Sequence, residues 1–203
     1  MIAALLNPGS YTINHGENLA GEPLDEVIFN NVEAGIENVK KVPEHIDESE
    51  LFLRGALTRI ALMGGALERV LDLTVQYAKE RTQFGRAIGR FQAVQQQLAV
   101  LAGEVTAAGM AAKVAISESE ETADPSETAI AKIAVGQAVG RVVPIAHQVH
   151  GAIGFTDEHA LQQSTRRLWV WRDEYGNESE WADRLGQEVL LKGSEGVWPF
   201  ITR

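Results

Sequence analysis

A long run of apolar residues at helical spacing is the feature that most limits how this chain can fold. From Glu48 onwards, leucine, isoleucine and valine recur every three or four positions for about thirty residues. The members of this run are Leu51, Leu53, Leu57, Ile60, Leu62, Leu67, Val70, Leu71, Leu73 and Val75. Apolar residues at this period lie along one side of an α-helix, so the pattern predicts one long, largely buried helix.

The rest of the chain supplies helices that could cover this one. The pattern predicts helices over residues 91–117, 125–149, 157–171 and 178–192, with a loop at 173–177. Asp124 and Pro125 fit the cap and first position of the third helix, and the polar stretch from Ser117 to Pro125 fits a solvated loop before it. Pro144 removes one backbone donor and predicts a kink or break nearby. The expected fold class is mainly α, an up-down helical bundle formed by residues 47–203.

Residues 1–46 differ from the helical part in composition and in the pattern of apolar residues. They contain three of the six prolines. Short runs that favour β structure lie at Tyr11–Ile13 and Glu26–Phe29. We therefore expect strands and turns ahead of the bundle.

Composition excludes several classes of function. The chain has 28 acidic and 18 basic residues, a formal charge of -10, and no cysteine. The charge disfavours nucleic-acid binding, and the lack of cysteine excludes disulfides and thiol nucleophiles and fits a cytoplasmic location. No membrane span is expected, on the reasoning that charged residues interrupt every long apolar stretch.

The end of the first long helix gathers groups suited to a nucleotide cofactor. Arg81, Gln83, Phe84 and Gly85 follow one another closely, and Gln92 comes shortly after them. A planar guanidinium bridges two phosphate oxygens, and glutamine amides reach sugar hydroxyls or base edges. The alternative is that Arg81 caps the helix and Phe84 belongs to the core.

A second group lies where the third helix ends in a glycine turn. Gln148 precedes Gly151, Gly154 and Phe155. Glycine lets the backbone approach a ligand closely, and Gln148 could hydrogen-bond a nucleotide. The histidines at 147 and 150 lack a convincing third ligand, so no metal is expected.

Glu174 is the one candidate for a general base. Trp169, Trp171 and Tyr175 surround it in the sequence, and partial desolvation would make its carboxylate a stronger base. The alternative is a plain ion pair with a nearby arginine, the choices being Arg166, Arg167 and Arg172.

Taken together, these segments resemble the acyl-CoA dehydrogenase family over residues 54–190. The matches are Tyr-Ala-x-Glu-Arg-x-x-Phe-Gly ending at Gly85, then Phe-Gln at Gln92, and later the glutamine and glycine turn of residues 148–155. The resemblance implies the family's C-terminal helical domain, with residues 1–46 as a remnant of its middle β domain. It also implies FAD as cofactor, bound by Arg81, Gln83, Phe84, Gln92, Gln148, Gly151 and Asn177, with the glutamine and glycine turn contributed by a neighbouring subunit.

Departures from the family pattern affect the expected chemistry. Ala152 replaces a glycine, Asn177 stands where threonine is common, and an ungapped count places Tyr175 where the family has its glutamate. Some relatives carry the base on the first long helix, but the matching position here is Gly55. Glu174, one residue earlier than expected, is the remaining candidate.

The resemblance implies α,β-desaturation of an acyl-CoA thioester by a homodimer or tetramer, or by a complex with a heteromeric dehydrogenase partner. The alternative is a noncatalytic subunit, or a helical oligomerisation module, that contributes half a FAD site to such a partner.

Overall fold

The first long helix forms as the sequence predicts. A computed structural model of the chain describes residues 1–117, 119 and 123–201. Helix α1 spans Glu48–Glu80 and begins at Asp47, whose side chain accepts a hydrogen bond from the Glu50 amide at 2.8 Å. Its buried side includes Ile60, Met63 and Leu67, none of which is solvent-accessible.

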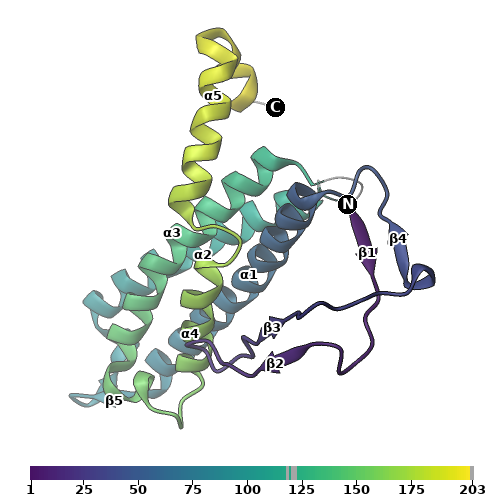
Figure 1. The fold of residues 1–203 in the computed structure, drawn as a ribbon. Helices are drawn as coiled ribbons and strands as arrows, with labels where there is room; N and C mark the ends of the chain where they lie inside the picture. Colours follow the sequence, from purple (N-terminus) through teal and green to yellow (C-terminus); the bar gives the residue numbers. More distant parts are fainter. Residues whose placement is uncertain (118, 120–122, 202–203) are drawn as a thin grey trace.

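Helices α2 (Gln92–Ser117) and α3 (Pro125–His150) pack against α1 and against each other to form the core (Figure 1). Many core residues of α2 and α3 are alanine, which lets helices approach closely. The cap expected at Asp124 is confirmed, because its side chain accepts from the amides of Ser126 and Glu127 at 2.8 and 2.9 Å. The expected loop before it falls partly outside the described residues.

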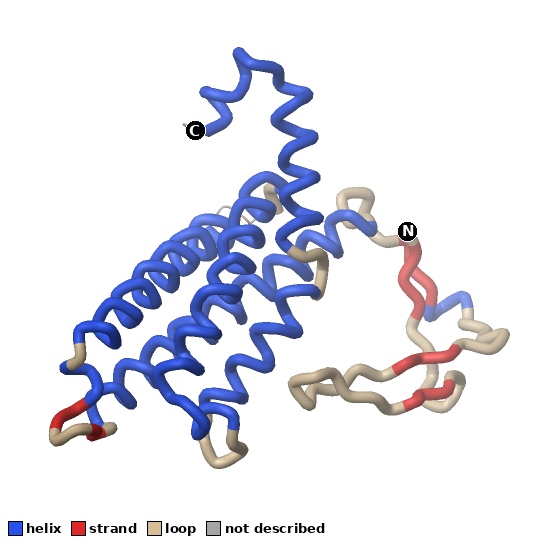
Figure 2. Tube along the Cα trace, turned by 90° about the vertical axis from the view of Figure 1, so that its left-hand side faces the viewer, coloured by secondary structure: helices blue, strands red, loops and turns tan. Residues whose placement is uncertain are grey.

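Two shorter connections and two more helices complete the bundle. The hairpin of β5 (Thr82–Gln83) and β6 (Arg86–Ala87) and the 3-10 helix η2 (Ile88–Arg90) join α1 to α2. The 3-10 helix η3 (Gly151–Phe155) leads from α3 to α4 (Leu161–Asp173), and α5 (Glu178–Ile201) extends beyond the bundle (Figure 2).

Several predicted boundaries need correction. The break considered at Pro144 is wrong, since α3 continues to His150. The fourth helix begins at Leu161 rather than 157, because the 3-10 turn and the bends after it occupy the intervening residues. The predicted end of the final helix at Lys192 agrees with a break at Gly193, whose φ of 66° is not helical, but the further helical segment that follows as far as Ile201 was not predicted.

Residues 1–46 form two separate strand pairs. Strand β1 (Ile2–Ala4) pairs with β4 (Val39–Lys41), β2 (Thr12–Asn14) pairs with β3 (Glu26–Ile28), and a 3-10 turn η1 (Ile36–Asn38) precedes β4. Within the described chain, nothing before Leu53 is buried. Isolated pairs of strands are marginal on their own, so this segment lacks a core of its own.

One turn of this segment is fastened to α4. Arg166 donates to the Leu19 carbonyl at 2.6 Å, while Arg167 and the Trp171 indole both contact the Glu22 carboxylate, at 3.1 and 2.9 Å. These contacts fix the strand segment beside the helix that leads to Glu174.

Two helical stretches, Gln92–Ser117 and Pro125–Phe155, are long and apolar enough to cross a membrane by length and composition alone. Charged residues do interrupt both stretches, as expected, with Glu104 and Lys113 in the first and Glu127, Lys132 and Arg141 in the second. Both stretches pack inside the bundle against α1, which identifies them as core helices.

Candidate functional site

The two motifs that the sequence predicts to bind a nucleotide lie at one end of the bundle. Figures 1 and 2 both show the β5–β6 hairpin and the turn between α3 and α4 at this end. A direct contact ties them together, because the ring of Tyr77 near the end of α1 stacks on His150 of α3 with 4.5 Å between centroids. The fold therefore gathers residues that are far apart in the sequence.

The hairpin presents its tip to solvent. Phe84 and Gly85 have φ values of 51° and 78°, the pair of positive values that a tight two-residue hairpin turn requires. Phe84 is 93% exposed, so the alternative that it belongs to the core is wrong. Arg81 ends α1, and among the described residues no hydrogen bond or ion pair engages its guanidinium.

The glycine turn exposes its ligand-binding candidates in the same way. Gln148, Gly151 and Gln92 are all exposed. Gly151 has φ 66°, and a Cβ added there would meet no atom within 4 Å. The Gly151 amide caps α3 by donating to the His147 carbonyl, and the space beside its Cα is open, which suits close approach of a ligand.

Two histidines behind this turn point inward, where their hydrogen bonds set their protonation. The His150 Nδ1 lies 2.8 Å from the Ala146 carbonyl, which only accepts, so that nitrogen carries the proton. The His147 Nε2 lies 3.0 Å from the Thr165 hydroxyl, which itself donates to the Gln162 carbonyl. The other ring nitrogen of each histidine is buried, and that of His147 has no hydrogen-bond partner among the described residues. Burial lowers the pKa of both imidazoles.

This arrangement predicts loss of stability in mild acid. Near pH 6.5 the two imidazoles of the unfolded chain bind protons that the same imidazoles in the folded chain do not bind. The free energy of unfolding is therefore highest above that pH and falls as the pH drops below it. The slope approaches ~1.4 kcal/mol per pH unit for each proton. Denaturant unfolding between pH 5 and 8 measures it. His147→Gln should reduce the slope and His45→Gln, at an exposed position, should not; equal slopes in all three proteins would contradict the assignment.

Glu174 lies at the end of α4, where it forms an ion pair with Arg59 of α1. The guanidinium of Arg59 also lies 5.8 Å from the centre of the Trp171 ring. The alternative of an ion pair at Glu174 is therefore right in kind, but the partner comes from a different helix than the three arginines considered.

Tyr175 follows Glu174 in the sequence, and its ring packs against Gly55 of α1. A Cβ added at Gly55 would come within 2.2 Å of the Tyr175 ring, so only glycine leaves room for it. The ring also meets Phe52 edge-on, with centroids 5.9 Å apart. Tyr175 has φ 55°, an unusual value for a bulky residue.

A pair of glycine substitutions tests this packing. Gly55→Ala should destabilise the protein by about 1–3 kcal/mol, because the new methyl group overlaps the ring. Gly65→Ala on the same helix meets no atom within 4 Å and should stabilise it by about 1 kcal/mol through helix propensity. Chemical denaturation measures both. In a Tyr175→Ala background Gly55→Ala should become stabilising, and a persistent penalty there would show that the ring is not the cause.

Asn177 has a structural task. Its side chain caps α5, accepting from the amides of Ser179 and Glu180 at 3.0 and 3.1 Å. A contact with a flavin would have to use the hydrogen-bonding capacity that the Asn177 side chain has left after capping α5.

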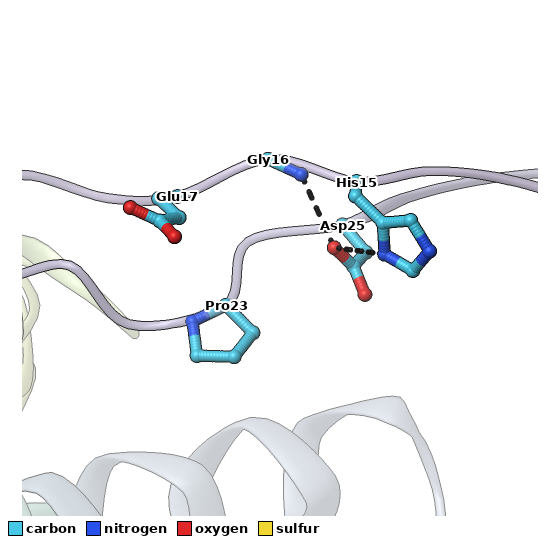
Figure 3. Close-up of a pocket in the computed structure, with 5 residues that line it drawn as sticks. All are labelled: His15, Gly16, Glu17, Pro23 and Asp25. Carbon is cyan, nitrogen blue, oxygen red and sulfur yellow. Dashed lines mark hydrogen bonds and ion pairs between the residues drawn. The ribbon is translucent and has the colours of Figure 1, made fainter.

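A hollow of about 460 Å³ lies away from all of these groups, in the strand segment (Figure 3). His15 and Gly16 both approach the Asp25 carboxylate there, at 3.3 and 3.2 Å. The hollow is open and has none of the expected site residues. No group of three or more potential metal-ligating side chains is found among the described residues.

Comparison with known proteins gives a consistent result. The family model for the acyl-CoA dehydrogenase C-terminal domain matches residues 49–177. Acyl-CoA dehydrogenase IpdE2 of Mycolicibacterium smegmatis is 36% identical over 71% of this chain and 45% of its own length. Glutaryl-CoA dehydrogenase of Desulfococcus multivorans is 31% identical over 71% of this chain and 38% of its own length. The chain thus spans less than half of either relative.

Solved structures share the fold. A glutaryl-coenzyme A dehydrogenase in complex with glutaryl-CoA has a TM-score of 0.78 at 27% identity, covering 90% of this chain and 48% of that one. The ChsE4-ChsE5 complex from Mycobacterium tuberculosis gives 0.79 at 23% identity, covering 90% and 50%.

Proposed function

Because this chain belongs to the acyl-CoA dehydrogenase family, through its C-terminal helical domain, we propose that it forms part of a FAD-dependent enzyme that desaturates an acyl-CoA thioester. The observation that carries the proposal is that the hairpin and the glycine turn are both exposed at one end of the bundle, so that pairing of this end with the same end of a neighbouring subunit would bring the two motifs of different chains together. Since the chain spans less than half of the two relatives compared, we propose this activity for the whole enzyme of which these residues form a part. We take residues 1–46 as the end of the family's middle β domain.

The exposed groups at the bundle end fit a dinucleotide. Arg81 would bind pyrophosphate oxygens through its free guanidinium. Gln83, Phe84 and Gln92 would contact the adenosine part, and Gln148 and Gly151 would reach the same cofactor from a neighbouring subunit. Asn177 would touch the flavin end. A site shared in this way requires a closed oligomer, so we propose a cytoplasmic homodimer or tetramer, or a heteromer.

In the reaction, bound FAD supplies the acceptor for a hydride. Glu174 would take the α proton of the acyl group, a task for which its carboxylate must be ionised and within reach of that proton. The ion pair with Arg59 uses the Oε2 atom of Glu174, so the α proton would go to Oε1.

A noncatalytic subunit is the second candidate. The two positions at which the family carries its carboxylate are occupied here by Gly55 and Tyr175, which pack against each other and have no carboxylate. The ion pair of Glu174 with Arg59 also favours this candidate. In this case the chain would contribute half a FAD site to a fuller partner. The name of the ChsE4-ChsE5 complex, which joins two differently named chains, supports assembly of this kind.

The visible spectrum and solution mass of the purified chain test the proposal. With excess FAD and after removal of free cofactor, we expect flavin absorption bands on an oligomer. A monomer without flavin, both alone and after mixing with a full-length dehydrogenase partner, would contradict both candidates.

A further inference from the structure

A lysine side chain is buried in the middle of the bundle. Lys132 of α3 is 1% exposed, although lysine is among the residues least often buried. It follows Thr128 and precedes Val135 on the buried side of the helix. A buried ammonium needs partners, and those partners identify its task.

The partners are backbone carbonyls at the end of α4. The Lys132 Nζ donates to the carbonyls of Arg172 and Gly176 at 2.7 and 2.6 Å, with the Trp171 carbonyl at 3.5 Å. The last carbonyls of a helix lack intrahelical partners and carry partial negative charge. Lys132 thus caps α4 from another helix, and its bonds span the turn that follows.

That turn has a demanding backbone. Tyr175 and Gly176 adopt φ values of 55° and 85° in succession, and the first is costly for a residue with a side chain. The Tyr175 carbonyl accepts from the Trp181 indole at 2.9 Å. The carbonyls are thus held by α3 and α5, whereas the side chains of Glu174 and Tyr175 contact α1.

We propose that Lys132 is the positioning residue of this turn: its ammonium fixes the strained backbone, so that Glu174 and Tyr175 are held against α1. Lys132 itself is buried away from the exposed surface. The proposal deepens the function proposed above and rests on it only for the role of the turn in catalysis.

The positive charge of the Lys132 ammonium contributes to this positioning role. Burial lowers the pKa of Lys132 to about 8, against the opposing effects of Asp173, Glu174 and Glu180. The ammonium is therefore largely intact near neutral pH and loses a proton slightly above it. A neutral amine has two donors for the carbonyls in place of three.

Exchange of the Trp181 indole proton, followed by NMR in the full chain, reports on the turn directly. Lys132→Met should accelerate this exchange about 10- to 100-fold, the effect of losing hydrogen bonds to a charged group. Lys113→Met, at an exposed position of α2, should leave it unchanged. Unchanged exchange in folded Lys132→Met would overturn the proposal.

If Lys132→Met does not fold, a pH titration of the unmodified protein still tests the proposal. The Lys132 side-chain signals should titrate with a midpoint near pH 8, and the Tyr175 ring signals should shift with the same midpoint. Tyr175 signals that stay constant from pH 7 to 9 while Lys132 titrates would refute the coupling.

A failure of the proposed function can be distinguished from a failure of the Lys132 proposal. Faster indole exchange with an unchanged kcat in a reconstituted enzyme would keep Lys132 as the positioning residue and remove the turn from catalysis. A lower kcat with KM preserved would support both.

Discussion

Glu174→Gln should lower the rate of flavin reduction by acyl-CoA by about 10²- to 10⁴-fold, the usual contribution of a general base. The measurement requires the chain in an assembly that carries out the reaction, followed by stopped-flow absorbance under single-turnover conditions. Glutamine keeps the size of the side chain but cannot accept the α proton. The loss should therefore appear in the chemical step rather than in substrate binding.

Stability must be measured beside the rate, because Glu174→Gln also leaves Arg59 without its anionic partner. We expect a cost of about 1–3 kcal/mol in the free energy of unfolding. Asp173→Asn, at the exposed neighbouring carboxylate, is the matched control and should keep most of the activity. A full rate with Glu174→Gln would leave the residue a structural role only and would favour the noncatalytic subunit.

Arg81→Ala should weaken FAD binding by about 10- to 100-fold. Hydrogen bonds between a guanidinium and phosphate oxygens are charge-assisted, and each contributes about 1.5–3 kcal/mol. The side chain is exposed, so its removal should change the free energy of unfolding by less than about 0.5 kcal/mol. Fluorescence titration with FAD measures the affinity.

Arg69→Ala is the control for this prediction, because it removes the same charge from an exposed position in the middle of α1. Its effect on FAD affinity should be small and should vanish at high salt. Equal losses for the two variants would mean that Arg81 acts only through the net charge of the protein.

The sequence predicted the helical elements well because their signals are local. The apolar period of α1 and the Asp124–Pro125 cap each lie within a few turns of one helix. The boundary errors arose at η3, where a 3-10 turn replaces the start of a helix, and at Gly193, where helix resumes after a break.

The site was harder to predict, because its contacts join distant parts of the chain. Neither Arg59 as the partner of Glu174 nor Tyr175 against Gly55 has a local sequence signal. Lys132 did leave one, since it interrupts the apolar side of α3 at core spacing. A charge at such a position indicates a buried partner, although the sequence cannot identify carbonyls at the end of another helix.

The central claim is that one FAD is held by Arg81 of one subunit and Gln148 of its neighbour. Mixing Arg81→Ala chains with Gln148→Ala chains tests it most directly, with bound flavin counted after subunit exchange. Each variant alone should retain little FAD. In a two-fold assembly the mixture should recover about a quarter of the wild-type sites, because half of the dimers are mixed and each rebuilds one intact site. No recovery in a mixture shown to have exchanged subunits would place both residues on the same cofactor from one chain and contradict the claim.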